Sequence, residues 1–461
     1  MQELLFTTAA RASAYLEYLQ QRSVKPYPSA FNDLRYFDEP LPEHPSDALA
    51  VLAILDEYGS PTTMASAGGR YFGFVTGGTL PAALAATWMA AAWDQNASLR
   101  VMSPISAQLE DISLGWLIDL LGLPSNCAGA FVSGATLANL TALAAARHAL
   151  LQHQGWDVEA RGLFGAPELC IIVGEEVHVS VIKALGLLGL GRERLVRVPS
   201  DSQGRMRADL LPRLNERSIV CVQAGNVNTG AIDPLRAICT CAAEAGAWVH
   251  VDGAFGMWAA ATPRYAALVD GVAMADSWAT DAHKWLNVPY DSGIAFCRRP
   301  EDLRGAMAVL APYLVPSDQR EPQHYGPEFS RRARGVEIWA ALKSLGRSGV
   351  AELIEGCCQH AARFAEGLRA AGYEVLNDVI LNQVLVSFGE DATTQAVIQA
   401  IQEEGTCWCG GSVWHGRTAM RISVSSWATT AEDVERSLAA ICKVAAHITE
   451  LPHQRRSSAG S

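Results

Sequence analysis

A carboxylate and an amine in the second half of the chain have types and surroundings that suit carbonyl chemistry. An apolar run beginning at Ala247 leads into Asp252, which predicts a buried strand with a carboxylate at its C-terminal end, where open α/β sheets bind ligands. Further along, Lys284 stands between His283 and Trp285, so bulky neighbours flank its amine. Such an amine can form a Schiff base, and a carboxylate can keep a pyridine nitrogen protonated. Alone, the acid is commonly a cap and the lysine a surface residue, but together they predict pyridoxal phosphate chemistry.

A turn of small residues upstream predicts where the phosphate binds. Ser133-Gly134-Ala135-Thr136 follows a short apolar run and precedes a helical pattern. Small residues let backbone N–H groups approach an anion, the hydroxyl of Thr136 adds a donor, and a helix N-terminus favours negative charge. We therefore assign Gly134, Ala135 and Thr136 to cofactor binding.

These motifs resemble the group II pyridoxal-phosphate-dependent amino acid decarboxylases, a family of aromatic amino acid, glutamate and histidine decarboxylases. The resemblance rests on H-V-D-G-A-F-G around Asp252 and D-A-H-K-W around Lys284, and it extends over about residues 65–445. It implies fold type I, the aspartate aminotransferase-like α/β architecture, with a mostly parallel seven-stranded sheet in a large domain and a smaller α+β C-terminal domain. It also implies pyridoxal 5'-phosphate as cofactor, an amino acid as substrate, and a homodimer with shared active sites.

The resemblance gives roles to further cofactor-binding residues. His178 stands where relatives stack an imidazole on the cofactor ring, and Asn226 where relatives contact the ring's phenolic oxygen. A capping histidine and a turn asparagine are the alternatives. In the family's S-G-G-S-E-A-N stretch, this chain has Ala135 for a glycine and Leu137 for the acid. The other cofactor-binding positions that we assign are Ala254, Ser277 and His283.

The predicted substrate end consists of aromatic residues, an arginine and a loop. Tyr71 and Phe72 resemble the strip that lines the family's substrate pocket, although aromatic residues at this density are equally often core. Arg421 lies where fold type I enzymes often bind a substrate carboxylate, with a structural salt bridge as the alternative. Tyr325 lies in the segment Ser317–Pro327, whose family counterpart supplies the tyrosine that protonates Cα. That loop is shorter here and does not align without a gap.

The predicted reaction is decarboxylation of an L-amino acid to the amine and carbon dioxide by a PLP-dependent carboxy-lyase, with Lys284, His178, Asp252 and Tyr325 as catalytic residues. If Tyr325 does not quench the carbanion, an aldehyde synthase, an aldolase-like lyase or an aminotransferase is the alternative. A protein that retains the scaffold only for binding or assembly would usually have lost Lys284 or Asp252, and both are present.

Composition indicates a globular enzyme. With 461 residues and 49% hydrophobic residues, the chain can bury a large core in two or three domains. A net charge of −12, with basic residues clustered only in pairs, argues against nucleic acid as a partner. The 11 cysteines lack C-x-x-C spacing, which predicts reduced thiols and no metal site. The first residues do not resemble a secretory signal, and no apolar stretch reaches the roughly 20 residues of a membrane span, so we expect a cytoplasmic protein.

Periodicity predicts three parts and a tail. Residues 1–80 read as an N-terminal helical arm and substrate strip, 81–312 as a large cofactor-binding domain, 313–452 as a small α+β domain, and 453–461 as a disordered tail. Strands are expected at Ala130–Val132, Glu168–Val173, Ile219–Gln223, Trp248–Val251, Gly293–Phe296, Val384–Phe388 and Ala419–Val424.

Overall fold

The computed structural model describes residues 1–309 and 319–458, and its contacts divide the chain into two compact units. Unit 1 comprises Met1–Gly78, His360–Leu376 and Val384–Ser461, and unit 2 comprises Thr79–Gln359 and Asn377–Gln383. The helix α10 (Gly335–Ala370) begins in unit 2 and ends in unit 1, and it breaks at Gly346, whose φ is 62°.

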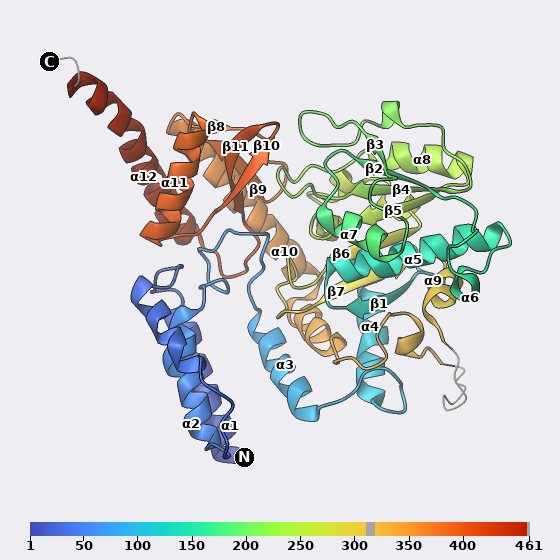
Figure 1. The fold of residues 1–461 in the computed structure, drawn as a ribbon, viewed down its shortest axis with the longest axis horizontal. Coiled ribbons are helices and arrows are strands. Elements are labelled where there is room, and N and C mark those ends of the chain that lie inside the picture. Colours follow the sequence, from blue (N-terminus) through green and yellow to red (C-terminus); the bar gives the residue numbers. More distant parts are fainter. Residues whose placement is uncertain (310–318, 459–461) are drawn as a thin grey trace. The chain divides into compact units, whose positions relative to one another are not determined.

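Unit 2 is built on a seven-stranded sheet with the order β1-β7-β6-β5-β4-β2-β3 (Figure 1). Only β7 runs antiparallel to its two neighbours, and the other paired strands are parallel. The predicted mostly parallel α/β sheet is therefore confirmed. The strands are β1 (Ala128–Val132), β2 (Cys170–Gly174), β3 (Val196–Val198), β4 (Ser218–Gln223), β5 (Trp248–Asp252), β6 (Ser277–Asp281) and β7 (Gly293–Cys297).

The central strands are covered on both faces. Every residue of β4 and β5 is buried, as expected of parallel strands with apolar residues on both sides. The strand β6 is also fully buried, but the sequence did not predict it because S-W-A-T-D has no continuous apolar run. Burial against β5 and β7, rather than local pattern, makes this segment a strand.

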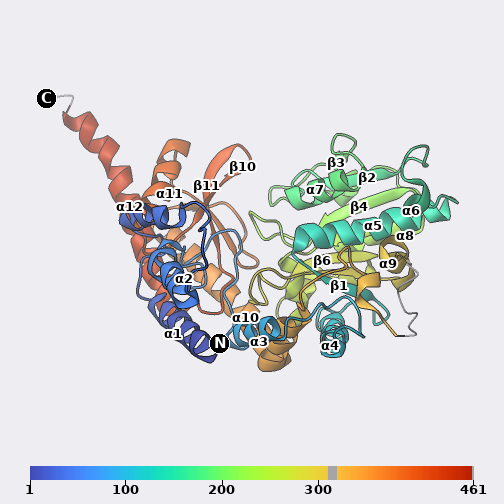
Figure 2. The same cartoon turned by 60° about the horizontal axis from the view of Figure 1, so that its bottom comes forward.

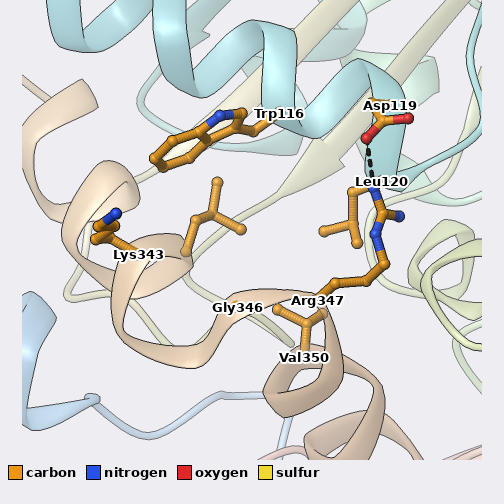
Figure 3. Close-up of a pocket in the computed structure, with 8 residues that line it drawn as sticks. Trp116, Asp119, Leu120, Lys343, Gly346, Arg347 and Val350 are labelled. Carbon is orange, nitrogen blue, oxygen red and sulfur yellow. Dashed lines mark hydrogen bonds and ion pairs between the residues drawn. The ribbon is translucent and has the colours of Figure 1, made fainter.

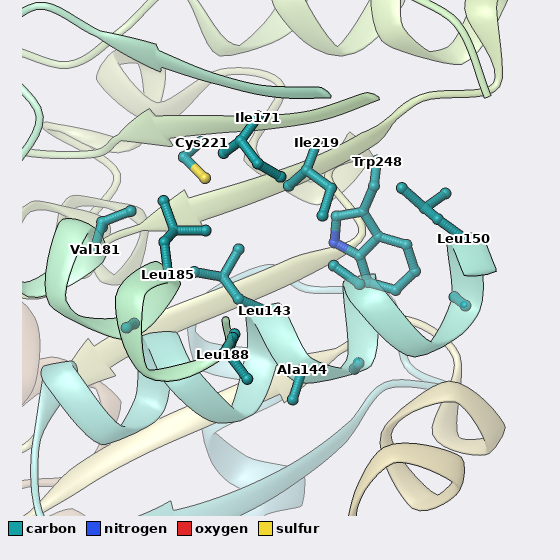
Figure 4. Close-up of a cluster of buried hydrophobic side chains, with 14 of the residues drawn as sticks. Leu143, Ala144, Leu150, Ile171, Val181, Leu185, Leu188, Ile219, Cys221 and Trp248 are labelled. Atoms are coloured by element: carbon teal, nitrogen blue, oxygen red, sulfur yellow. The ribbon is translucent and has the colours of Figure 1, made fainter. Parts of the chain in front are cut away.

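Helices pack against this sheet and form the core of unit 2 with it. Both ribbon views show α5 lying across the strands beside α7 (Figures 1 and 2). Leu143 and Leu185, from these two helices, pack with Ile219 and Trp248 from the strands (Figure 4). The unit 2 helices besides α10 are α3 (Pro81–Trp93), α4 (Pro104–Leu120), α5 (Ala135–His153), α6 (Val158–Arg161), α7 (Val179–Leu187), α8 (Leu235–Ala245) and α9 (Pro300–Met307).

Unit 1 contains a four-stranded sheet with the order β10-β11-β9-β8. The hairpin β10–β11 closes through His415 and Gly416, both with positive φ, as two-residue type I′ turns require. The strands are β8 (Glu374–Val375), β9 (Gln383–Ser387), β10 (Gly410–Trp414) and β11 (Arg417–Ser423), and the helices are α1 (Gln2–Tyr18), α2 (Ala48–Ile54), α11 (Asp391–Glu404) and α12 (Ala431–Ser458). Among the residues described, no helix is long and apolar enough to span a bilayer.

The compact units differ from the expected domain boundaries. The N-terminal arm belongs to unit 1, because Val24 N–H donates to Gly405 O at 2.8 Å and Phe72 N–H to Trp408 O at 2.8 Å. The boundary expected at residue 312 falls inside unit 2. There Glu110 on α4 forms ion pairs with Arg320 and Arg331 and ties the following segment to the large sheet's unit.

The predicted disorder of the tail from His453 stays a prediction. Helix α12 is assigned up to Ser458, and residues 459–461 lie outside the described part.

Candidate active site

A pocket at the C-terminal ends of β1, β2, β5 and β6 gathers most of the predicted cofactor residues. The parallel strands bring these ends to one edge of the sheet, where doubly wound folds bind ligands. The predicted residues that line it are Gly134, Ala135, Thr136, His178, Ala254, His283 and Lys284.

The amine of Lys284 lies against the buried carboxylate of Asp281 at the end of β6. Lys284 Nζ is 3.1 Å from Asp281 Oδ2, while Asp281 Oδ1 accepts a hydrogen bond from Ala135 N–H at 2.6 Å. One carboxylate therefore fixes both the lysine and the start of α5. Sequence analysis gives Asp281 no role, because no local pattern reveals that α5 begins beside it.

His283 presents its Nε2 side to the same pocket. Its Nδ1 accepts from Ser292 N–H at 3.1 Å, so the ring proton of the neutral imidazole lies on Nε2. Burial lowers the pKa of His283, although the nearby Asp281 opposes this shift. The ring also stacks on Tyr290 with centroids 4.3 Å apart. His283 is therefore held as an uncharged donor.

The turn between β1 and α5 forms a small cradle. A Cβ on Gly134 would lie 3.2 Å from His283 Cε1, and a Cβ on Gly293 would lie 2.4 Å from Gly134 Cα. Two glycines thus allow β7, the turn and the histidine to meet closely. The N-terminus of α5, a helix of 19 residues, opens into this cradle and favours an anion.

Asp252 is buried at the end of β5 and accepts three hydrogen bonds. Its Oδ1 accepts from Ala254 N–H at 3.2 Å, and its Oδ2 accepts from Asn139 Nδ2 at 3.2 Å and from Ser180 Oγ at 3.3 Å. Sequence reasoning missed Asn139 and Ser180. Their positions in S-G-A-T-L-A-N and V-H-V-S were visible, but only the fold shows that α5 and α7 direct both side chains to one carboxylate.

His178 joins the same group of residues. It caps the N-terminus of α7, with Nδ1 accepting from Ser180 N–H at 3.3 Å and lying 2.8 Å from Ser180 Oγ. The capping role therefore holds, and the ring also lines the pocket. Ser180 Oγ also contacts Asp252, so Ser180 links His178 to this carboxylate.

Ser277 and Asn226 have other neighbours than predicted. Ser277 begins β6, at the opposite end of the strand from Asp281, and its Oγ bonds Trp248 Nε1 at 2.9 Å and His250 Nδ1 at 3.0 Å. Asn226 Oδ1 accepts from the N–H groups of the two turn residues Asn228 and Thr229, which is the turn alternative. Its Nδ2 is buried without a hydrogen-bond partner among the described residues.

Tyr325 lies elsewhere in unit 2. The guanidinium of Arg320 lies over its ring, 4.6 Å from the centroid, and the ring packs against the core cluster that includes Cys297 and Leu303. It is therefore not grouped with the residues around Lys284 in the same chain. Ser317 and Asp318, at the start of the predicted loop, lie outside the described residues.

The predicted substrate residues belong to unit 1. Tyr71 stacks on Trp408 with centroids 5.1 Å apart, and Phe72 meets the edge of Phe364 at 5.0 Å, so both rings make core contacts. Arg421 on β11 is buried, which lowers the pKa of its guanidinium. Within the described residues no carboxylate forms an ion pair with it, and its Nε has no hydrogen-bond partner. The structural salt bridge is thus absent from the described part of the chain.

A second pocket lies between α4 and α10 in unit 2. Figure 3 shows Trp116 and Lys343 at one end and the ion pair of Asp119 with Arg347 at the other. Both members of this pair are exposed, so the pocket has the character of a surface groove.

The residues around Lys284 fit pyridoxal phosphate. The cradle suits a phosphate, the lysine suits an aldehyde, and the buried Asp252 suits a pyridine nitrogen. Asn226 Nδ2, buried and unpartnered in the described structure, is a donor of the kind that a phenolate oxygen would accept from.

The family model described as "Pyridoxal-dependent decarboxylase conserved domain" matches residues 32–389. The chain belongs to this family. Pyridoxal phosphate is accordingly its cofactor, and it is a PLP-dependent carboxy-lyase of fold type I. The predicted family, fold and cofactor are confirmed.

Individual relatives carry several activities in their names. The chain is 28% identical over 345 residues to an aromatic-L-amino-acid decarboxylase of Bacillus atrophaeus, covering 72% of this chain and 69% of the relative. It is 29% identical to an L-2,4-diaminobutyrate decarboxylase of Rhizobium meliloti, covering 81% and 77%. It is 27% identical to a phenylacetaldehyde synthase of Petunia hybrida, covering 58% and 55%. The crystal structure of Oryza sativa TDC with PLP and tryptamine shares the fold, with a TM-score of 0.88, 22% identity, and coverage of 97% and 98%.

Proposed function

We propose that this enzyme removes the α-carboxylate of an L-amino acid as carbon dioxide and releases the amine, with Lys284 as the Schiff-base lysine. The observation that carries the proposal is the convergence of Lys284, His178 and the α5 cradle on one pocket at the carboxyl end of the sheet. A fold type I enzyme needs these three groups around one cofactor: an amine, a ring-stacking group and an anion site.

Bound pyridoxal phosphate supplies an electron sink for the bond broken at Cα. The chain's own residues orient the reactants. Asp252 would accept a hydrogen bond from the pyridine nitrogen, and the α5 N-terminus with His283 Nε2–H would hold the phosphate. His178 would contact the ring and can hold a proton at Nε2, because its Nδ1 is occupied by the Ser180 contacts. Asp281 holds the Lys284 amine in place in the pocket, with Nζ 3.1 Å from Oδ2.

Arg421 is proposed to bind the substrate carboxylate. A buried guanidinium is costly unless an anion pairs with it, and the described residues supply none. A carboxylate ligand satisfies the requirement with two parallel hydrogen bonds. Tyr71 and Phe72 stay proposals for the apolar wall, weakened by their core contacts.

The working form is proposed to be a homodimer. In α1 and α2, which the structure describes in full, no residue is buried. On α3, Trp88, Met89 and Trp93 are exposed although the helix is apolar. Exposed apolar surface on this scale is typical of a subunit interface. The eleven cysteines are all free, which supports a reducing compartment such as the cytoplasm.

The position of Tyr325 supports an aldehyde synthase as the second candidate function. Its ring lies under Arg320 and against the core cluster of unit 2, not among the residues lining the Lys284 pocket, so the predicted Cα proton donor is not at its own chain's site. A carbanion that is not protonated can be oxidised by oxygen, which is reduced to hydrogen peroxide, and hydrolysis by water then gives the aldehyde and ammonia besides the carbon dioxide. A tyrosine from the second subunit would restore simple decarboxylation.

The test is to incubate the PLP-loaded enzyme with a panel of L-amino acids, measuring carbon dioxide and oxygen while identifying products by mass spectrometry. We expect one carbon dioxide per amine without oxygen uptake, and no turnover with Lys284→Ala. Carbon dioxide with aldehyde, ammonia and oxygen uptake would select the synthase. Absence of carbon dioxide with every substrate would overturn the proposal, as would turnover by Lys284→Ala.

A further inference from the structure

A line of buried polar side chains runs behind Asp252, away from the pocket. It begins at Trp248, passes through Ser277, His250 and Asn139, and ends at Asp252. The successive separations are 2.9, 3.0, 2.9 and 3.2 Å, and all five side chains are buried. Burying polar groups costs free energy unless they are hydrogen-bonded. A row of five hydrogen-bonded side chains within the core therefore calls for an explanation.

The chemistry of the two ends fixes the direction of every hydrogen bond. The indole N–H of Trp248 can only donate, so Ser277 Oγ accepts from it and donates its own proton to His250 Nδ1. Burial lowers the pKa of His250 to about 4, so the imidazole is neutral and its remaining proton is on Nε2. That proton goes to Asn139 Oδ1, which leaves the amide's Nδ2 facing Asp252.

This direction matters because an asparagine amide has nearly the same shape when its oxygen and nitrogen are exchanged. An exchanged Asn139 would put Oδ1 against the Asp252 carboxylate, where two acceptors repel. It would also put Nδ2 against His250 Nε2–H, where two donors meet. His250 therefore prevents the rotation, and Ser277 with Trp248 fixes the tautomer of His250.

We propose that Asn139 and His250 are positioning residues for the cofactor: with Ser277 and Trp248 they deliver a hydrogen bond of fixed direction to Asp252 and hold its carboxylate for the pyridine nitrogen. The inference rests on the proposed role of Asp252. Neither residue lines the pocket, and Asn139 Nδ2 donates to Ser180 Oγ at 3.2 Å as well as to Asp252, so both residues act through these two groups. Among the hydrogen bonds of the described residues, Asp252 Oδ1 accepts from Ala254 N–H, and a carboxylate oxygen can accept from a second donor.

The experiment compares four variants of the full-length enzyme. His250→Phe keeps an aromatic ring but removes both nitrogens, and Asn139→Asp keeps the shape but turns a donor into an acceptor. Ser277→Ala breaks only the distant link. His250→Gln is the conservative control, because its amide can donate to Asn139 and accept from Ser277. For each, equilibrium dialysis measures the Kd of PLP, and thermal unfolding is followed with and without PLP.

We expect His250→Phe and Asn139→Asp to raise the Kd of PLP by about tenfold or more, the effect of one charge-assisted hydrogen bond. In the same two variants, the increase in Tm that PLP produces should be smaller than in the wild type. His250→Gln should restore most of the affinity, and Ser277→Ala should fall between. A merely structural role would lower the Tm with and without PLP equally and leave the Kd unchanged, which would overturn the proposal.

Asp252→Asn separates this inference from the proposed function. If Asp252→Asn weakens PLP binding but His250→Phe and Asn139→Asp do not, only the positioning chain is wrong. If Asp252→Asn itself binds PLP as tightly as the wild type, the role of Asp252 is wrong and the inference fails with it. Should His250→Phe fail to fold, Asn139→Asp and Ser277→Ala still decide the question.

Discussion

Arg421 and Lys284 are two buried or half-buried cations that the protein treats in opposite ways. Lys284 pairs with Asp281 at 3.1 Å, so its charge is compensated before any ligand arrives. Arg421 is buried without an ion-pair partner among the described residues. A buried charge without an ion-pair partner raises the free energy of the folded protein. We therefore expect Arg421, rather than Lys284, to bind an added carboxylate.

Replacing Arg421 tests its role at the scale of a single residue. We expect Arg421→Met to raise the KM for the amino acid about 100-fold, the effect of losing one partner of a buried charge pair. Its Tm should stay the same or rise, because a buried unpaired charge is removed. Steady-state kinetics and thermal unfolding measure the two effects. The matched control is Arg417→Met on the same strand, whose guanidinium is exposed and paired with Glu374. Equal changes in KM for both variants would refute the assignment.

At the scale of elements, the cofactor cradle depends on how closely β7 approaches the turn before α5. Gly293 pairs with Val132 at the end of β1 and with Asp281 at the end of β6. Its missing side chain lets the backbone of Gly134 lie against it. The spacing of three elements around the phosphate site thus depends on this glycine as well as on the hydrogen bond from Ala135 N–H to Asp281.

Adding one methyl group at Gly293 tests this packing. A Cβ there would lie 2.4 Å from Gly134 Cα and 2.5 Å from its carbonyl carbon, and neither backbone atom can move alone. We expect Gly293→Ala to displace the turn and weaken PLP binding by about tenfold or more, together with about 1–3 kcal/mol of stability. Spectroscopic titration with PLP and chemical denaturation measure these effects. Gly115→Ala, on α4 with open space around it, is the control and should be neutral or stabilising. An unchanged PLP affinity in Gly293→Ala would contradict the packing argument.

At the scale of the whole molecule, the exposed apolar residues of α3 are the strongest sign of a second subunit. Ala83 on this helix is buried, whereas Met89 is 55% exposed and Trp88 is 44% exposed. A helix that is apolar all round belongs in a protein interior or at an interface. The homodimer therefore remains a proposal that the surface of a single chain supports.

A charge placed on α3 tests the dimer. Met89→Glu should shift the protein from dimer to monomer and abolish decarboxylation, because burying an unpaired carboxylate in an apolar interface costs several kcal/mol. Light scattering after size-exclusion chromatography measures the mass. Phe164→Glu is the control, since Phe164 is 98% exposed in a loop and should tolerate the charge. A dimeric, active Met89→Glu would place the interface elsewhere.

The buried His250 also gives the whole fold a pH dependence. Its folded-state pKa is lowered to about 4 by burial, against about 6.5 for an unfolded histidine. Protonation therefore favours the unfolded chain, and stability is lost as the pH falls from about 6.5 toward 4, by up to about 3 kcal/mol. Denaturation at several pH values should show a shallower loss in His250→Gln than in the wild type. Asp233, whose burial raises its pKa to about 6, titrates in both proteins and cancels in the comparison. Parallel curves would show that His250 does not contribute.

The sequence alone determined the cofactor and most of the fold. Asp252, Lys284 and the turn before α5 are local signals, because each depends on a strand end or a helix start that neighbouring residues define. Parallel strands then carry such ends to one edge of the sheet without further information. The confirmed family, α/β sheet and cofactor all follow from this kind of local pattern.

Only the tertiary structure decided which side chains meet those residues. Asn139, Ser180 and His250 come from three elements, and the hydrogen bonds that link them to one another and to Asp252 span from 41 to 113 positions of sequence. Ser277 was assigned to the cofactor, but packing bonds it to a buried histidine, while Asn226 uses its Oδ1 in a turn and keeps only its Nδ2 for a cofactor. A polar residue's partner is set by which elements pack together, and that depends on burial summed over the whole sheet rather than on its own neighbours in sequence.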